Sequence, residues 1–516
     1  MNKSKIITKT RVILLSIFLF TIAIRLILAF SVPNLTYDSY YHLGHVENIM
    51  ETGVPLYEDP LSYGGRELRF LPLFHYFAAL LMFIFPFANE ISAKIISNIL
   101  FACLPLVIYL IAKKISKQER APLFSALVAA FLPINFQTNS FSPLPFALLL
   151  IFTCIYFYLN FNLGAGKRYL YFYLISLILL LMSSSLASVL IFSLIFYVGF
   201  SKLENKSLSS GELELTIFSS FFFLWAQFIF FKDTFLNEGI SFIWQNIPSS
   251  ILVEYFPKVN LITALLLLGI IPFITALYLT YTSVFKERNK DIILIICIAI
   301  TISLLTWFRL VPLLTALSFL GLVVAVLFAP FYDKLIDYYQ KTRFNKRQVQ
   351  SSKVKLTNFR NCVGLILTII LLLTLLWPAV TYALDQDTPT DQEVVTFSWL
   401  KDNSPEDTVI LSSLKEGHLV TYYADRKNVM DTTFELIPDI EVRFAELNSM
   451  YTSYFQTQVI GIADKYDIRY LVLTSSTKEH YNISKFEYLN KDCFDLQYNE
   501  EDNRIYQLTC TLKIEE

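Results

Sequence analysis

The chain has 516 residues, of which 55% are hydrophobic, and a formal net charge of −1. Apolar runs of roughly 18 to 24 residues recur through its first three quarters, and each can cross the ~30 Å hydrocarbon core of a bilayer. This composition excludes a soluble globular protein and predicts a polytopic α-helical membrane protein. Basic residues gather at the predicted helix ends, where they set orientation, so they indicate no nucleic-acid partner.

Charge divides the chain into two unequal parts. Residues 385–516 hold 12 Lys+Arg and 25 Asp+Glu, a net charge of −13, whereas residues 1–384 hold 30 basic and 18 acidic residues, a net charge of +12. This asymmetry predicts a multi-span membrane domain over residues 1–384 and a soluble domain over residues 385–516.

The positive-inside rule sets the expected topology, because a basic segment with Lys3, Lys5, Lys9 and Arg11 precedes the first apolar run. We expect a cytoplasmic N-terminus, a location in the cell membrane and an external loop over residues 33–90. Residues 70–87 are apolar too, but a span there would place the basic cluster at 113–120 outside, so we predict a helix lying at the interface. The remaining clusters fit about eleven spans, at 12–32, 91–112, 121–138, 143–160, 168–182, 186–200, 213–231, 259–282, 290–307, 310–330 and 362–384.

This topology places residues 385–516 outside the cytoplasm, and their patterns predict a small α/β domain. Val394–Lys401 has helical spacing, while residues 408–411 and 469–474 read as buried strands. Cys493 and Cys510 flank a predicted hairpin symmetrically, so we predict a cross-strand disulfide if the domain is extracytoplasmic.

The stretch Tyr37–His45 follows the first span and concentrates polar and aromatic side chains. Asp38, His42 and His45 are spaced i, i+4 and i+7, which places all three on one face of a helix that begins near Asp38. Two interpretations remain open, a metal cluster and a simple N-cap by Asp38. Tyr41 in the same stretch is a candidate substrate contact.

Other external charges are candidates for substrate binding. Arg309 lies between two predicted spans, where a lipid phosphate would satisfy a membrane-edge guanidinium; snorkelling to headgroups is the alternative. Glu238 and Glu254 lie in a second large external loop, and Arg25 lies within the first span. The other polar residues of the first loop are interpreted mostly as solvated charges: Glu58, Asp59, Arg66, Glu67, Arg69 and His75.

Several motifs together resemble the GT-C membrane glycosyltransferases, most of all the catalytic subunit of oligosaccharyltransferase of the archaeal type. The first acidic motif of that family, an Asp followed by aromatic residues, resembles Tyr37–His42. Residues 397–408 look like the helix and Pro turn that precede the family's WWDYG motif, and 417–431 keep its later rhythm. The resemblance implies a transferase that uses a polyprenyl-phosphate- or polyprenyl-diphosphate-linked sugar, with Asp38 as base or orienting carboxylate and Arg309 holding the donor phosphate.

Two family motifs are not kept. The stretch Thr138–Leu144 carries no carboxylate where the second acidic motif stands, and Ser413–Gly417 keeps only the Gly of WWDYG. The resemblance still implies a divalent Mg²⁺ or Mn²⁺ with Asp38 as its ligand, and catalysis with one loop carboxylate and no metal is the alternative. His42 gains no support from the resemblance and is a candidate second ligand by its place on the same helix face. The acceptor is a protein or a lipid. The alternative function is a non-catalytic relative that binds lipid-linked glycan or assists assembly; a transporter is a third, weaker interpretation.

Overall fold

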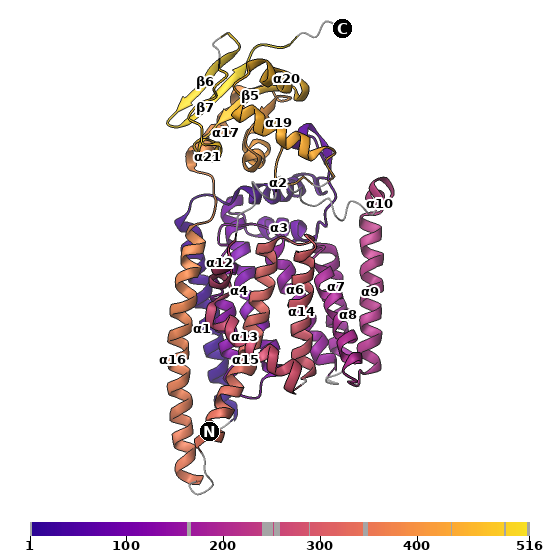
Figure 1. Cartoon of the computed structure of the whole chain (residues 1–516), viewed down its shortest axis with the longest axis vertical. Helices are drawn as coiled ribbons and strands as arrows, with labels where there is room; N and C mark the ends of the chain where they lie inside the picture. Colours follow the sequence, from indigo (N-terminus) through magenta and orange to yellow (C-terminus); the bar gives the residue numbers. More distant parts are fainter. Residues whose placement is uncertain are drawn as a thin grey trace.

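The fold is described from a computed structural model of the chain. It describes residues 3–162, 167–239, 251, 259–287, 289–343, 349–434, 436–489 and 492–512. Most of the chain folds into a long helical bundle. The C-terminal part, which contains a β-sheet, lies at one end of this bundle (Figure 1).

Seven helices of the described part are long and apolar enough to cross a membrane. They are α1 (Lys3–Ser31), α4 (Asn89–Ile115), α6 (Leu144–Asn162), α9 (Ser210–Phe230), α14 (Lys290–Trp307), α15 (Leu313–Arg343) and α16 (Val349–Leu384). An eighth is the pair α12 (Leu261–Leu268) and α13 (Ile270–Thr282), bent by 87°. The bend falls at Gly269, whose φ of 77° disfavours other residue types.

The predicted count of eleven spans is therefore not confirmed. Three predicted spans form helices of only 10 to 17 residues, namely α5 (Ala121–Ala130), α7 (Lys167–Ser183) and α8 (Ala187–Leu203). The chain leaves α5 at Phe131 for a short 3-10 turn over Pro133–Asn135, because Pro133 cannot donate a hydrogen bond to a continuing helix. Hydropathy alone does not predict that α5 ends at Ala130.

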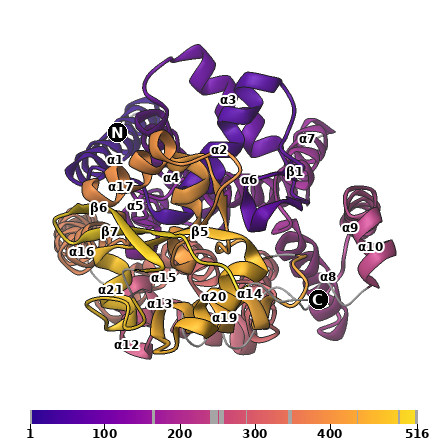
Figure 2. The same cartoon turned by 90° about the horizontal axis from the view of Figure 1, so that it is seen from above.

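The loop after α1 forms α2 (Tyr37–Thr52), the short strands β1 (Glu58–Asp59) and β2 (Arg66–Glu67), and α3 (Leu73–Ile84). Both helices lie across the end of the bundle beneath the sheet-containing part (Figure 1). One face of α3 is buried at Phe74 and Ala78, while Phe83 stays 78% exposed. This arrangement agrees with an interfacial helix rather than a span. At the edge of the bundle, α9 leads into α10 (Lys232–Glu238) (Figures 1 and 2).

The C-terminal part is a mixed sheet with helices, as predicted for an α/β domain. The sheet order is β4-β3-β5-β7-β6; β3 pairs in parallel with β4 and β5, and β7 pairs antiparallel with β5 and β6. The strands are β3 (Val409–Leu411), β4 (Lys427–Asn428), β5 (Ile468–Leu473), β6 (Phe494–Glu500) and β7 (Asn503–Leu508). The helices are α17 (Asp391–Asn403), α18 (Gly417–Leu419), α19 (Ile440–Thr452), α20 (Gln456–Tyr466) and α21 (Ser475–Tyr481).

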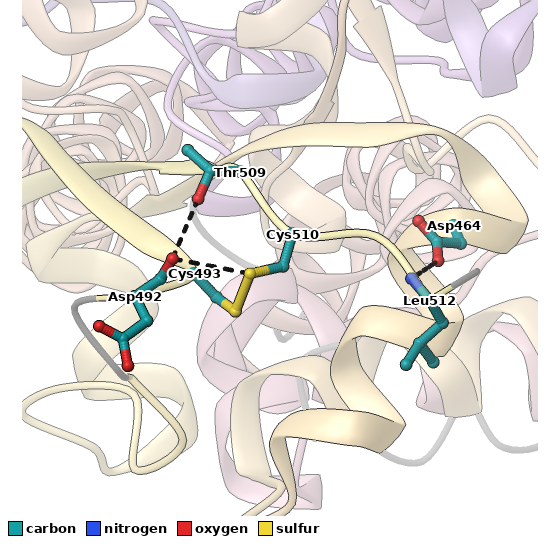
Figure 3. The surroundings of a disulfide bond; sticks show 6 residues. All are labelled: Asp464, Asp492, Cys493, Thr509, Cys510 and Leu512. Carbon is teal, nitrogen blue, oxygen red and sulfur yellow. Dashed lines mark hydrogen bonds between the residues drawn. A yellow bond between two sulfur atoms is a disulfide. The ribbon is translucent and has the colours of Figure 1, made fainter.

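The predicted disulfide between Cys493 and Cys510 is confirmed. It closes the open end of the β6–β7 hairpin, where the Thr509 hydroxyl donates a hydrogen bond to the Asp492 carbonyl at 3.5 Å (Figure 3). The Cys493 carbonyl accepts a further hydrogen bond from the Thr509 amide at 2.9 Å. Beyond it, the amide of Leu512 donates to Asp464 at the end of α20, which ties the C-terminal tail back to the domain.

Candidate functional site

Asp38 lies in the first turn of α2, and its carboxylate is exposed to solvent. A carboxylate here is favoured by the positive end of the helix dipole. The N-cap residue is Thr36, so the interpretation of Asp38 as the N-cap was wrong by two residues. Its Oδ1 accepts a hydrogen bond from Thr432 Oγ1 of the C-terminal part at 2.6 Å. This contact joins residues 394 positions apart in the chain.

The loop after α5 supports the beginning of α2 from below. The carbonyl of Asn139 accepts from the Thr36 amide at 3.0 Å, and Ser39 Oγ accepts from the Phe141 amide at 2.9 Å. Asn98 of α4 donates to the Thr138 carbonyl at 2.8 Å. The stretch that lacks the second acidic motif is therefore a buried support for the helix that carries Asp38.

The C-terminal part forms hydrogen bonds with the beginning of α2 from the opposite side. Tyr37 Oη donates to Glu393 Oε2 at 2.9 Å, and Glu393 also completes a capping box with Thr390 at the start of α17. Asn34 donates to Asp391 at 2.8 Å. Burial, followed by the charge of nearby Glu416, raises the pKa of Glu393 above its ordinary value. The position of Asp38 is therefore set by residues from both halves of the chain.

Four of the five histidines gather around Tyr41 at this junction. Its ring centroid lies 4.4 Å from that of His45 and 5.3 Å from that of His418. His42 Nδ1 lies 3.1 Å from Nε2 of His75 in α3. His45, His75 and His418 are each 2% exposed. The interpretation of His75 as a solvated loop residue was thus wrong, because α3 folds back onto α2.

Three of these imidazoles, those of His42, His45 and His75, are held neutral by their surroundings. Burial lowers the pKa of His42 and of His45 to about 3, with a further contribution from neighbouring charge, and burial lowers the pKa of His75 well below its ordinary value. The titratable groups that face them are Arg66, His418 and Asp431, and the three histidines also face one another. Neutral buried histidines make stability depend on pH.

We expect the protein to lose stability as pH falls from about 6.5 toward 3, because the unfolded chain binds protons on these histidines that the folded chain does not. Each histidine contributes at most about 1.4 kcal/mol per pH unit in that window. Thermal unfolding of the protein in detergent should show a lower Tm at pH 5 than at pH 7.5. The His42→Asn/His75→Asn double variant should show a smaller difference in Tm between pH 7.5 and pH 5. His480→Gln, at an exposed position, should show the same difference in Tm as the wild-type protein. If the double variant also shows the wild-type difference, the buried histidines are not the cause of the pH dependence.

A second centre beside the histidines is built on Asp431, which is fully buried. Its carboxylate accepts from Ser62 Oγ at 2.6 Å, Asn428 Nδ2 at 3.0 Å and the Thr433 amide at 2.8 Å. Arg66 Nη2 lies 3.6 Å from its Oδ1. Although burial raises the pKa of Asp431, His418, Arg66 and these donors outweigh burial and hold it below its ordinary value. Arg66 is buried as well, so its interpretation as a solvated charge was wrong.

Gly417, the residue kept from the WWDYG motif, packs directly against this centre. A Cβ there would lie 2.2 Å from the Met430 carbonyl oxygen and 2.7 Å from Asp431 Cβ. Those distances leave no room for a side chain. Glycine is needed here because the backbone of α18 approaches the segment that carries Asp431 and Thr432.

The residues before Gly417 that stand in place of the WWDYG motif are mostly buried, namely Ser413, Leu414 and Glu416. Glu416 is fully buried and accepts from Ser413 Oγ and Thr477 Oγ1, both at 2.7 Å. Lys415 donates to Asp387 at 3.1 Å. These side chains are used in holding the domain together, and they do not present the aromatic surface of the family motif.

Arg309 lies in the turn between α14 and α15, with φ of 59° and an exposed side chain. The neighbouring start of α15 is at the end of the bundle near α2, because Leu317 packs with Leu132 and Ile134, in the loop that supports α2. Within the described ranges, no residue pairs with the Arg309 guanidinium.

Three candidate residues from the sequence remain, namely Arg25, Glu238 and Glu254. Arg25 is buried in the bundle, with its Nε 3.1 Å from Asn98 Oδ1 and its guanidinium over the rings of Phe101 and Phe136, which gives it a structural role near the supporting loop. Glu238 ends α10, but its side chain lies outside the described residues, as does all of Glu254.

The prediction of Mg²⁺ or Mn²⁺ at Asp38 and His42 is not confirmed. Asp38 is bonded to Thr432, whereas His42 turns toward His75. Among the described residues, no three His, Cys, Asp or Glu side chains are arranged to hold a metal ion. Hard divalent cations favour several oxygen ligands, and the neighbouring stretch Thr138–Leu144 supplies no carboxylate. The residues present do not fit such an ion.

Comparisons with known proteins agree with this architecture. Residues 71–229 match the family model of dolichyl-phosphate-mannose-protein mannosyltransferase. No curated protein matches the chain by sequence.

Three solved structures are similar to most of the chain. Archaeal oligosaccharyltransferase AglB from Archaeoglobus fulgidus, in complex with an inhibitory peptide and a dolichol-phosphate, has a TM-score of 0.68 and 14% identity over 89% of this chain and 69% of that chain. The Archaeoglobus fulgidus enzyme with Zn and sulfate has a TM-score of 0.65 and 14% identity over 88% of this chain and 67% of that one. ArnT from Cupriavidus metallidurans bound to undecaprenyl phosphate has a TM-score of 0.56 and 10% identity over 95% of this chain and 97% of that one. The chain is therefore a multi-pass membrane protein with the fold of the GT-C glycosyltransferases, similar to archaeal oligosaccharyltransferase.

Proposed function

We propose that the protein is a membrane glycosyltransferase that moves a sugar or oligosaccharide from a polyprenyl-phosphate- or polyprenyl-diphosphate-linked donor to an extracytoplasmic acceptor. The observation that carries this proposal is Asp38, an exposed carboxylate in the first turn of α2, held at the end of the bundle by Thr432. The relatives solved with dolichol-phosphate and undecaprenyl phosphate support a lipid-linked donor.

In the proposed reaction, Asp38 accepts the proton of the acceptor O–H or N–H group as that atom bonds to the anomeric carbon of the donor sugar. The bond between that carbon and the phosphate oxygen breaks, and the polyprenyl phosphate or diphosphate leaves. General base catalysis of this kind contributes about 10²–10⁴-fold to the rate. Arg309 stabilises the charge on the leaving phosphate, because guanidinium and phosphate form strong charge-assisted hydrogen bonds.

The remaining assignments belong to the same proposal. The membrane domain comprises residues 1–384 and the extracytoplasmic domain residues 385–516, in a cell-membrane protein whose N-terminus is cytoplasmic. Tyr41 and Glu238 contact the donor or the acceptor, which is a protein or a lipid. No step is routed through a divalent metal.

The test is transfer from a defined polyprenyl-phosphate-linked, radiolabelled sugar by the purified protein in liposomes. Arg309→Ala should lower kcat/KM by about tenfold, the loss expected for one exposed charge-assisted contact of ~1.4 kcal/mol. Arg168→Ala is the matched control, because Arg168 is an exposed arginine at the start of α7. Equal activity of the two variants would contradict the role of Arg309.

The second candidate is a non-catalytic relative that binds lipid-linked glycan or assists assembly. Two observations favour it. Ser413, Leu414 and Glu416, at the position where the family binds the acceptor, are buried. The loop after α5, at the position where the family binds the metal, supports α2 instead. If the wild-type protein binds the lipid-linked sugar but transfers none to any acceptor offered, this candidate replaces the first.

A further inference from the structure

We infer that Thr432 and His418 of the C-terminal part are positioning residues for Asp38. This inference rests on the proposed function, since it concerns how the proposed base is oriented. Thr432 Oγ1 lies 2.6 Å from Asp38 Oδ1 and 2.9 Å from His418 Nε2. The three side chains therefore form a continuous chain of hydrogen bonds from a buried imidazole to an exposed carboxylate.

The direction of this chain follows from its chemistry. A threonine hydroxyl has a single proton, and an ionised carboxylate is only an acceptor. Thr432 therefore donates to Asp38 and must accept from His418, so His418 carries its proton on Nε2. An exposed Asp38 would otherwise rotate about its side-chain torsions, and a donor that is itself fixed removes that freedom.

His418 is well placed to fix the hydroxyl. It is 2% exposed, its ring lies against that of Tyr41, and its Nε2 lies 3.9 Å from Oδ1 of Asp431. Asp431 is in turn held by Arg66 and Ser62 of the external loop. The Asp431 carboxylate attracts the proton to Nε2, which favours the tautomer that the chain requires.

This arrangement gives the C-terminal part a role in catalysis without contact with the reacting atoms. In this chain the Thr432 hydroxyl donates a hydrogen bond to the Asp38 carboxylate, for which the family resemblance implies a metal ion as the partner. The oxygen of Asp38 that faces Thr432 is fixed, so the other oxygen is the one directed to the acceptor.

The experiment compares Thr432→Val, which keeps the shape but removes the hydroxyl, with Thr432→Ser, which restores it. Transfer is measured in liposomes with the radiolabelled donor. We expect Thr432→Val to lower kcat by about tenfold with KM for the donor within twofold, because the carboxylate is no longer held in one orientation toward the acceptor. Thr432→Ser should recover most of the rate. Thr452→Val, at an exposed position of α19, should behave as wild type.

The outcomes separate this inference from the proposed function. Absence of transfer by the wild-type protein overturns the proposed function. Normal transfer by wild type together with an unchanged kcat in Thr432→Val overturns the positioning role alone. A loss in Thr432→Val that Thr432→Ser does not restore, or that raises KM as much as it lowers kcat, shows a structural effect and also overturns the positioning role. His418→Asn, tested in the same assay, should reproduce the kcat loss of Thr432→Val if the imidazole fixes the hydroxyl.

Discussion

Replacing Asp38 by Asn is expected to lower kcat for glycosyl transfer by at least about 100-fold, the lower end of the contribution of a general base. The amide keeps the size of the side chain but cannot take the acceptor proton at neutral pH. Folding should be little changed, because Asp38 is exposed and, among the described residues, the polar contact of its side chain is the hydrogen bond from Thr432. The measurement is initial-rate transfer from the radiolabelled lipid donor, with Tm recorded in parallel.

Glu51→Gln is the matched control for this variant, since Glu51 is an exposed carboxylate near the other end of the same helix. It should retain wild-type kcat. If Asp38→Asn also retains the wild-type rate while the protein is active, Asp38 is not the base and the mechanism drawn here is wrong.

The largest expected effect on stability comes from Asp431→Ala. Removing this carboxylate leaves the guanidinium of Arg66 buried without its anion and Ser62 Oγ without its acceptor. Asn428 Nδ2 loses one of its two acceptors and keeps the Gly417 carbonyl. Breaking a buried pair in this way costs about 3–5 kcal/mol. Thermal unfolding in detergent should show a markedly lower Tm, with early loss of the contact between the loop after α1 and the C-terminal part.

A double variant distinguishes the lost ion pair from general damage to the core. Arg66→Met/Asp431→Leu removes both charges, and it should recover part of the Tm that Asp431→Ala loses, since well-packed apolar side chains often replace buried ion pairs at little cost. Asp495→Ala, at an exposed position of β6, should leave Tm unchanged. A Tm for Asp431→Ala equal to that of Asp495→Ala would refute the proposed role of this centre.

Features with a strong local pattern were predictable. The strand predicted at 469–474 is β5 (Ile468–Leu473), and the helix predicted at 394–401 is α17. The Cys493–Cys510 disulfide followed from symmetry about a turn. Long apolar runs marked the membrane helices, but α5 ends at ten residues because backbone geometry at Pro133, and not hydropathy, decides where it stops.

The candidate site was predictable only in part. Asp38 could be found because it follows a span and begins an aromatic-rich helix. Thr432, His418 and Asp431 had no comparable signal, since the contacts that bring them to the loop after α1 span more than 350 positions of the chain. His75 and Arg66 were misinterpreted for the same reason. A polar residue in a loop is solvated unless another segment covers it, and local sequence does not say which segment does.

The sequence by itself determined the class of the protein, its acidic C-terminal part, most of its membrane helices and the place of Asp38, because hydrophobic length, charge and helix spacing act over neighbouring residues. The tertiary structure alone decided what surrounds Asp38. It turned His42 toward His75, made the loop at Thr138–Leu144 a support, and brought Thr432 within 2.6 Å of the carboxylate. The physical reason is that hydrogen-bond partners are fixed by packing of distant segments, which no local pattern encodes.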